Sequence, residues 1–261
     1  MKYAKKSLGQ NFLIDRNIIR KIINLINIKN KNIIEIGPGK GALTEEILKK
    51  NPKSLKLIEK DNNLSNQLNI KFFKKKKITI YNTDILKFNL EKVVSKNSII
   101  FGNLPYNISS QILVKMIKFK KWPPKYTDLI FMFQKELGEK IIGKYLSPNY
   151  SRLSILSSFR LDPINKFQVS AHCFFPKPKV TSIVIHFKVK NQKLFKIKKI
   201  NNLEKITNIF FSNKRKMINK SIKKIFNSNQ INKLLNLNLK LRPANIKPEI
   251  YYRITELFEK M

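Results

Sequence analysis

Three of the seven glycines in this chain of 261 residues fall within five positions. Gly37, Gly39 and Gly41 follow the apolar run at residues 32–36 and precede a predicted helix at residues 42–50. Glycine is needed where the backbone must turn tightly and approach a ligand with no side chain between them. The spacing therefore predicts a ligand-binding turn between a buried strand and a helix.

Two acidic residues accompany this glycine turn. Glu35 directly precedes the glycines, and Glu59 ends the next predicted strand. The distance to Glu59 fits the roughly 20-residue spacing at which a carboxylate accepts hydrogen bonds from ribose hydroxyls. A carboxylate at the turn disfavours a pyrophosphate and suits a cation. The pattern predicts a nucleoside cofactor with a cationic end, such as S-adenosylmethionine.

Asp84 follows the third predicted strand, at the same carboxyl edge of the expected sheet. There it can accept a hydrogen bond from the adenine amine of the cofactor. It can equally serve as the N-cap of a helix, where aspartate is favoured. The spacing alone does not separate these two interpretations.

The segment Asn103-Leu104-Pro105-Tyr106 directly follows the fourth predicted strand. The exocyclic amine of adenine is a poor nucleophile, because its lone pair is delocalised into the ring. The amide oxygen of Asn103 and the carbonyl of Leu104 can each accept one N–H and turn the lone pair toward a methyl donor. Pro105 stiffens the turn, and Tyr106 offers a face for base stacking. The alternative is an ordinary strand-to-loop turn with a core tyrosine.

The surrounding chain supplies the elements that would position these residues. Strands are predicted at 32–36, 54–59, 78–81, 98–102 and 127–133, with helical stretches between most of them. This alternation predicts an α/β domain with a parallel sheet and helices on both faces. Further strands are predicted at 164–169 and 181–189, and helices at 203–211, 217–226, 231–237 and 249–258. We expect a catalytic domain at residues 1–190 and a helical domain at 191–261.

The charge predicts a polyanionic partner. Lysine and arginine total 54 against 16 acidic residues, a net charge of +38, and phosphate neutralisation drives nucleic-acid binding. The alternative is passive drift, because Lys, Asn and Ile are all abundant, as codon bias in an AT-rich genome would produce. Several basic clusters are candidate phosphate contacts, among them Lys214-Arg215-Lys216.

Composition also bounds location and metal use. No apolar run is long enough to span a bilayer, and the basic N-terminal residues precede no signal-peptide core, so a cytoplasmic protein is expected. The single cysteine, Cys173, has no disulfide partner. With His172 and His186 it forms no convincing metal site, and we expect no metal.

The chain resembles the ribosomal RNA adenine dimethyltransferase family over nearly its whole length. The motifs that carry the resemblance are residues 8–13, 34–39, 101–109, 131–136, 150–154, 174–180 and 213–216. The resemblance implies a Rossmann-like sheet that binds S-adenosylmethionine, followed by a small all-helical domain that binds RNA. Lys60 departs from the family pattern, in which an apolar residue is usual between the two acids.

The resemblance also implies roles for individual residues. Asn11 and Leu13 would line the cofactor pocket, and Phe174 would sandwich the target base opposite Tyr106. Gly37, Glu59, Asp84 and Asn103 would match the other cofactor contacts of the family, beside Gly39 of the glycine turn.

Within the family, the likeness is greatest to the bacterial small-subunit enzymes. These dimethylate two adjacent adenines in a hairpin loop near the 3′ end of 16S rRNA, on the immature subunit. A monomer is expected. Two alternatives stay open: a 23S rRNA adenine methyltransferase of the macrolide-resistance type, and a non-catalytic assembly factor. The residue types of the motif at 103–106 and the helical tail favour a small-subunit enzyme over a 23S enzyme. A non-catalytic assembly factor is disfavoured by the intact glycine turn, by Glu59 and by Asn103.

Overall fold

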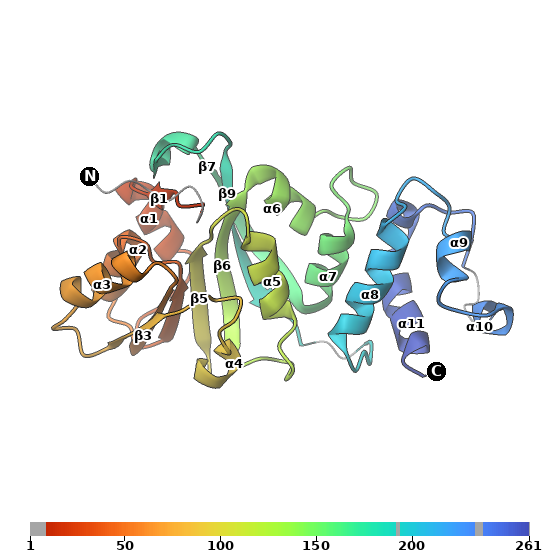
Figure 1. The fold of residues 1–261 in the computed structure, drawn as a ribbon, viewed down its shortest axis with the longest axis horizontal. Coiled ribbons are helices and arrows are strands. Elements are labelled where there is room, and N and C mark those ends of the chain that lie inside the picture. The colour runs from red at the N-terminus through yellow and green to blue at the C-terminus, as the bar shows by residue number, and fades with distance from the viewer. Residues whose placement is uncertain (1–8, 192–193, 233–236, 261) are drawn as a thin grey trace. The chain divides into compact units, whose positions relative to one another are not determined.

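The computed structural model describes residues 9–191, 194–232 and 237–260 (Figure 1). The chain clusters into two compact units. The first, here called the α/β unit, comprises residues 1–138 and 162–189, and the second, the helical unit, comprises residues 139–161 and 190–261. The segment 139–161 thus groups with the C-terminal helices, whereas the sequence analysis assigned it to the first domain.

The α/β unit is built on a seven-stranded sheet whose order is β4-β3-β2-β5-β6-β9-β7. Its strands are β2 Asn32–Ile36, β3 Ser54–Glu59, β4 Ile78–Asn82, β5 Ser98–Asn103, β6 Tyr126–Gln134, β7 Leu161–Val169 and β9 Ser182–Val189. Strands β2 to β6 are parallel, as expected. The strand predicted at 181–189 is confirmed as β9, and it pairs antiparallel with β6, a direction that the sequence analysis did not assign. Strand direction is not encoded in apolar patterning, because buried strands of either direction are continuous apolar runs.

The strand order reverses in the middle of this sheet. The chain moves outward from β2 through β3 to β4 and then returns to the other side of β2 as β5. Ligands of open α/β sheets bind at such a switch point, in the crevice outside the carboxyl ends of the strands. The glycine turn follows β2 and the Asn103 segment follows β5, so both motifs meet at this crevice.

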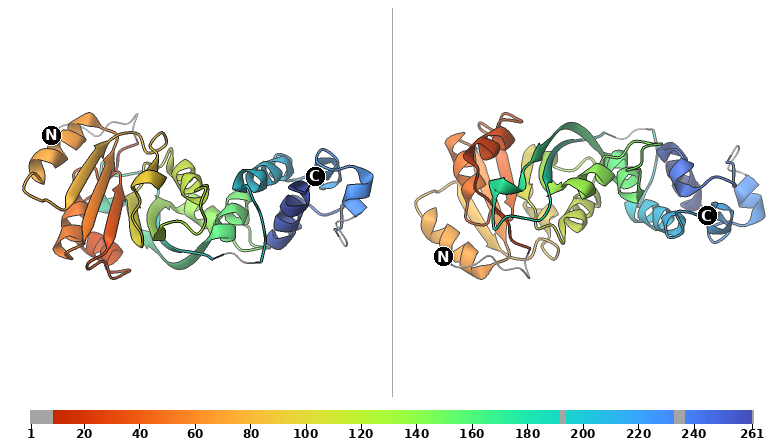
Figure 2. Two further views of the ribbon diagram at one scale, coloured as in Figure 1. Left: turned by 90° about the horizontal axis from the view of Figure 1, so that it is seen from below. Right: turned by 90° about the horizontal axis from the view of Figure 1, so that it is seen from above.

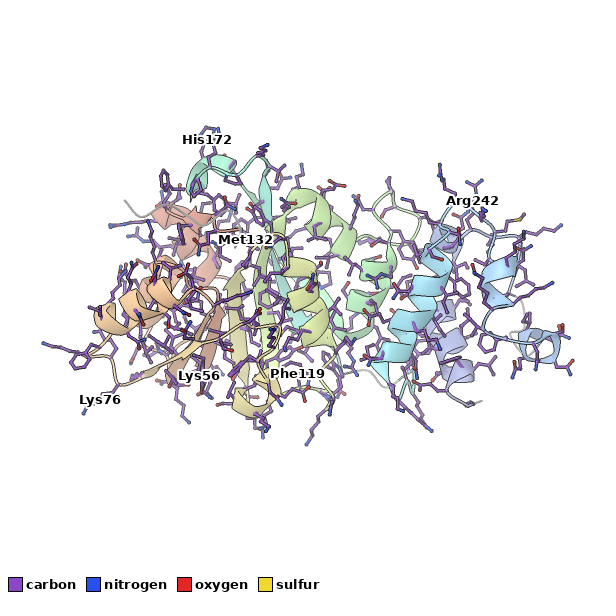
Figure 3. The ribbon with its side chains drawn as sticks, viewed as in Figure 1. Lys56, Lys76, Phe119, Met132, His172 and Arg242 are labelled. Carbon is purple, nitrogen blue, oxygen red and sulfur yellow. The ribbon has the colours of Figure 1, made fainter. Side chains whose placement is uncertain are left out.

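Helices lie on both faces of the sheet (Figure 2). Helices α1 Arg16–Ile23, α2 Ala42–Lys49 and α3 Asn62–Lys71 pack with alternate residues of the strands in one apolar core, in which Met132 is buried (Figure 3). Asp15 and Asp61 cap α1 and α3 by accepting from the backbone amides two and three residues later. The remaining helices of this part of the chain are α4 Leu90–Val93, α5 Ser109–Ile117 and α6 Lys135–Ile141, the last of which runs into the next unit.

A small second sheet joins the N-terminal segment to the segment before β9. Strands β1 Phe12–Leu13 and β8 Phe174–Phe175 pair antiparallel, with Phe12 opposite Phe175 and Leu13 opposite Phe174. A short 3-10 helix, η2 Ala171–Cys173, leads into β8, and the Cys173 carbonyl accepts from Ile14 N at 2.9 Å. The sequence analysis missed this pair, because two-residue strands carry no periodicity.

The helical unit contains α7 Arg152–Arg160, α8 Ile200–Phe211, α9 Asn219–Ile222, α10 Ser228–Asn232, η3 Pro243–Asn245 and α11 Pro248–Phe258. The predicted helices at 203–211 and 249–258 are confirmed. The predicted helix at 217–226 is reduced to the single turn of α9, after which turns continue to Phe226. The predicted helix at 231–237 falls partly on residues 233–236, which lie outside the described residues.

Buried tyrosines fix this unit internally. The hydroxyls of Tyr150, Tyr251 and Tyr252 donate to the carbonyls of Ile246, Pro243 and Ile155 at 2.8, 2.8 and 3.1 Å. Burial raises the pKa of all three phenols, so they stay neutral donors. Across the described parts of the chain, each helix is too short or too polar to cross a membrane.

Candidate active site

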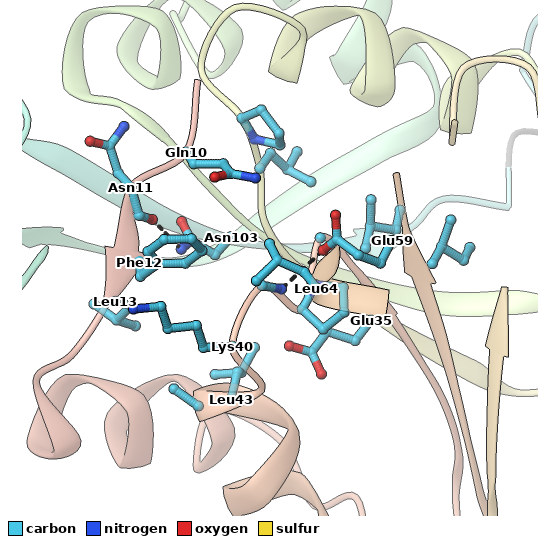
Figure 4. A pocket seen from close by; sticks show the side chains of 18 of the residues that line it. Gln10, Asn11, Phe12, Leu13, Glu35, Lys40, Leu43, Glu59, Leu64 and Asn103 are labelled. Atoms are coloured by element: carbon cyan, nitrogen blue, oxygen red, sulfur yellow. Dashed lines mark hydrogen bonds between the residues drawn. The ribbon is translucent and has the colours of Figure 1, made fainter. Parts of the chain in front are cut away.

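A cavity of about 470 Å³ opens at the crevice between the ends of β2 and β5 (Figure 4). Its wall contains the glycine turn, the end of β3 and the segments 9–14 and 103–108. All of these belong to the α/β unit. The volume is in the range of small-molecule sites, which are about 300–1,000 Å³.

The glycine turn forms the floor of the cavity between β2 and α2. Gly37, Gly39 and Gly41 all adopt left-handed backbone conformations, with φ of 69°, 58° and 81°. A side chain at position 39 would also collide with Phe12, because an added Cβ would lie 2.9 Å from its ring. The sequence prediction of a strand–turn–helix at these glycines is confirmed.

Backbone donors hold the Glu59 carboxyl group. Gly39 N donates to its Oε2 at 3.1 Å, and Asp61 N donates to its Oε1 at 2.9 Å. The Lys60 backbone also donates to this carboxyl group, whose two oxygens can together accept about four hydrogen bonds, so capacity for a ligand remains. Burial raises the pKa of Glu59, while these backbone bonds oppose that rise. The group is therefore fixed in orientation at the wall of the cavity.

Glu35 differs from the expectation of a charged carboxylate at the turn. It is 2% exposed and accepts a 2.6 Å hydrogen bond from the Thr44 hydroxyl. Burial raises its pKa to about 8, and the nearby charge of Glu59 adds to the rise. Near pH 7 the free protein therefore holds this group mainly as the neutral acid. A cation bound beside it would favour the ionised form.

Asp84 is placed at the cavity but is not the N-cap of a helix. It lines the cavity, and its Oδ1 accepts from Leu86 N at 2.9 Å, which caps a turn rather than a helix. Its Oδ2 lies 2.9 Å from the ammonium of Lys60. This contact lowers the pKa of Asp84. Lys60, seen in the sequence only as a departure from the family, is thus a charged part of the wall.

Asn103 ends β5 and also lines the cavity. Its Nδ2 donates to the carbonyl of Asn11 at 3.0 Å, and Figure 4 shows this bond from the N-terminal segment to the end of the strand. The bond commits the amide nitrogen to the backbone and fixes the plane of the side chain. The amide oxygen is then the acceptor that this group can offer to a ligand.

The residues after Asn103 form a tight turn on the same wall. Leu104 is buried, and the Pro105 carbonyl accepts from Ile108 N at 3.1 Å. The Tyr106 hydroxyl lies 2.5 Å from the hydroxyl of buried Ser182. Burial raises the pKa of Tyr106. The ring is consequently anchored at its far end on β9.

The N-terminal segment closes one side of the cavity with Asn11, Phe12 and Leu13. Asn11 and Leu13 were singled out from the sequence, but Phe12 was not. The Lys40 ammonium lies 4.9 Å from the centre of the Phe12 ring, in cation–π geometry. The close approach of Phe12 to Gly39 could not be foreseen, because the two residues lie on separate elements.

Phe174 is not among the described residues that line the cavity. It is 3% exposed and belongs to the apolar core opposite Leu13, whereas its neighbour Phe175 is 50% exposed. Stacking of Phe174 on a base, as the resemblance implies, therefore requires its side chain to leave this core. That role stays a prediction.

The basic residues predicted to bind RNA do not line the cavity. Lys214, Arg215 and Lys216 occupy an exposed turn after α8 in the helical unit. His186 is buried, with its Nε2 2.7 Å from Asp128 Oδ1. Among the described residues, no cluster of His, Cys, Asp and Glu is arranged to hold a metal ion.

The sheet, with a glycine turn and an acidic strand end at its switch point, defines the class of S-adenosylmethionine-dependent methyltransferases. A dimethyladenosine transferase from Plasmodium falciparum has this fold, with a TM-score of 0.75 and 24% identity over 95% of this chain and 98% of that one. The 23S rRNA methyltransferase ErmE also has it, with a TM-score of 0.68 and 21% identity over 95% and 99%.

The family model for ribosomal RNA adenine dimethylase matches residues 1–260, and the chain belongs to this family. The ribosomal RNA small subunit methyltransferase A of Pelagibacter ubique is 43% identical over 259 residues, which cover 99% of this chain and 98% of that protein. The protein of the same name from Buchnera aphidicola is 39% identical, with 95% and 94% covered.

Proposed function

We propose that this enzyme transfers methyl groups from S-adenosylmethionine to N6 of two adjacent adenines in a hairpin loop near the 3′ end of 16S rRNA. Its relatives named as small-subunit methyltransferases support this substrate. The observation that carries the chemistry is the amide of Asn103, held by the Asn11 carbonyl at the rim of the cavity. The partner is 16S rRNA in the immature small subunit, and the enzyme acts as a cytoplasmic monomer.

The wall of the cavity fits the cofactor. Glu59 offers its remaining lone pairs to the ribose hydroxyls, and Asp84 offers its carboxylate to the adenine amine. The left-handed glycines at 37 and 39 let the backbone approach the ligand without a side chain between them. Glu35, placed beside the same turn, becomes ionised as the cationic end of the ligand arrives. Asn11 and Leu13 cover the site from the N-terminal side.

The catalytic residues act by orientation. When bound, S-adenosylmethionine supplies a sulfonium methyl group: N6 forms the new C–N bond, the C–S pair returns to sulfur, and one N6 proton leaves to water. Asn103 Oδ1 and the Leu104 carbonyl each accept one N–H of the target amine. Pro105 keeps the carbonyl in place, and Tyr106 stacks on the adenine from its anchor on Ser182. Phe174 covers the other face of the base. Fixed acceptors of this kind lower the barrier because they need no reorganisation.

RNA docking uses a second surface. Lys214, Arg215 and Lys216 are exposed together in one turn and contact phosphates without reading sequence. Recognition of the target then comes from the shape of the hairpin and from the extruded bases.

The decisive test is transfer of labelled methyl groups to unmodified ribosomal subunits, followed by mass analysis of the nucleosides. We expect dimethyladenosine in the small subunit alone. Dimethyladenosine in the large subunit would instead identify a 23S enzyme. No transfer to either subunit would identify a non-catalytic assembly factor.

A further inference from the structure

The small β1–β8 sheet presents two phenyl rings side by side. Phe12 and Phe175 are directly opposite each other in an antiparallel pair. Residues opposite each other in such a pair project from the same face, with Cβ atoms about 4.5–5.5 Å apart. The other cross-strand pair, Leu13 and Phe174, projects from the reverse face and is buried in the core. The two phenylalanines at 174 and 175 therefore have opposite environments.

Phe175 lies on the same face of the β1–β8 pair as Phe12, which belongs to the wall of the cavity. Its partner Phe12 lines the cavity, while Phe175 itself is 50% exposed. Ile14 and Val180, on the segments that flank the same pair, are also exposed. A ring left in water at the rim of a binding site is available for contact with the ligand.

The surroundings of this ring are cationic. Lys177 and Lys179 are exposed, and the Lys177 ammonium lies 3.1 Å from Nε2 of His172, which stands on the outer side of the same segment (Figure 3). Lys40 lies over the Phe12 ring. Aromatic faces beside cations are the surface on which single-stranded nucleic acid is held, by stacking of bases and neutralisation of phosphates.

We propose that Phe175 is a positioning residue that stacks on the nucleotide next to the adenine in the cavity. The inference rests on the proposed function, in which the two methylated adenines are adjacent. Because an RNA strand has a direction, Phe175 holds the second adenine when one of the pair occupies the site, and another flanking nucleotide when its neighbour does. The residue thereby retains the RNA between the methylation of one adenine and that of the next.

The test compares Phe175→Leu, which keeps an apolar side chain, with Phe175→Trp, which restores an aromatic face. Phe73→Leu is the matched control, because Phe73 is 84% exposed on a different segment. On unmodified small subunits, Phe175→Leu is expected to raise KM for the particle about tenfold, as loss of one base stack would. The kcat of the first transfer and the affinity for S-adenosylmethionine stay near those of the wild type. Phe175→Trp restores KM, and Phe73→Leu leaves it unchanged.

A second measurement does not depend on catalysis. A hairpin with 2-aminopurine in place of one adenine is bound in the presence of S-adenosylhomocysteine, and stacking is read from quenching of its fluorescence. We expect quenching by the wild type and by Phe175→Trp, and its loss in Phe175→Leu. If the proposed function is wrong, the wild type transfers no methyl groups. The fluorescence quenching still tests whether the nucleotide stacks on Phe175.

Three results would overturn the inference. An unchanged KM in Phe175→Leu would show that the ring makes no contact with the RNA. A fall in kcat with unchanged KM would put the ring against the target base itself. Equal quenching by the wild type and Phe175→Leu would exclude stacking of the neighbouring nucleotide.

Discussion

Hydrogen bonds between side chain and backbone serve different purposes at the cavity of the α/β unit and in the buried part of the helical unit. At the cavity, backbone groups hold polar side chains: Gly39 N and Asp61 N fix Glu59, and the Asn11 carbonyl fixes Asn103. In the helical unit, side chains hold the backbone, as the hydroxyl of Tyr251 does with the Pro243 carbonyl. At the cavity, Glu59 and Asn103 keep oxygens that a ligand can reach, whereas the Tyr251 hydroxyl is buried.

This contrast predicts that substitutions at the cavity affect function and substitutions of the buried tyrosines affect stability. Removal of a side chain that the backbone orients should impair chemistry or ligand binding with little effect on folding. Removal of a tyrosine hydroxyl that satisfies a buried carbonyl should reduce the free energy of unfolding with little effect on chemistry. Substitutions in the two units can confirm this separation or break it.

The largest effect is expected from Asn103→Ala. Loss of an oriented acceptor that acts on the reacting amine should lower kcat by roughly 10²–10³-fold. The affinity for S-adenosylmethionine should change only a few-fold. Methyl transfer and calorimetry measure the two, with Asn66→Ala, on the exposed face of α3, as the control. Equal loss of turnover and cofactor affinity would contradict the catalytic role.

Glu35→Gln should change how stability depends on pH. The folded protein holds the Glu35 proton up to about pH 8, whereas the unfolded chain loses it near the ordinary value of 4.5. The folded state binds more protons in this window, so the free energy of unfolding falls as pH rises, by up to about 1.4 kcal/mol per pH unit. Urea titrations should show this slope in the wild type and a flatter one in the variant. Parallel curves would refute the assignment.

Glu59→Ala should weaken binding of S-adenosylmethionine by roughly 10–100-fold, the loss expected for hydrogen bonds to a charged acceptor. Glu59→Gln keeps one acceptor oxygen, so its affinity for S-adenosylmethionine should lie between that of Glu59→Ala and that of the wild type. Calorimetry on the free enzyme gives both values. Unaltered affinity in Glu59→Ala would exclude the ribose contact.

Tyr251→Phe should reduce the free energy of unfolding by about 1 kcal/mol, because the buried Pro243 carbonyl loses one of its two donors and keeps Ile246 N at 3.3 Å. Tyr145→Phe serves as the comparison, since its bond to the Asn245 carbonyl is exposed and its loss should cost less. Urea unfolding measures both. Methyl transfer per folded molecule should stay constant. A fall in kcat in Tyr251→Phe would show that this hydroxyl affects catalysis as well as stability.

The smallest effect at a single salt concentration should come from Lys214, Arg215 and Lys216 changed together to Gln. The slope of log affinity for RNA against log salt should fall by about 2–3, because three phosphate contacts are lost. The matched control neutralises Lys74, Lys75 and Lys76, of which Lys76 extends from the loop between α3 and β4 (Figure 3). If both triple variants lower the salt dependence of RNA affinity equally, the positive charge of the protein contributes without a localised RNA-binding surface.

Much of the α/β unit could be predicted because it depends on local signals. Continuous apolar runs marked β2, β5 and β6, and the glycines marked the turn after β2. Helix α7 was missed although Ser151 and Ser154 form a capping box at its start. Its three serines and two arginines hide the apolar face that periodicity would reveal. The capping box of Ser151 and Ser154 is therefore the local sequence signal for this helix.

The sequence by itself determined that Gly37, Glu59, Asp84 and Asn103 meet at one crevice, since strand ends and a glycine turn come together there wherever parallel strands alternate with helices. Only the tertiary structure decided their states: that Glu35 is buried and holds its proton, that Asp84 pairs with Lys60, and that Phe174 lies inside while Phe175 lies outside. Burial and contact between distant segments set ionisation and exposure, and neither is a property of local sequence.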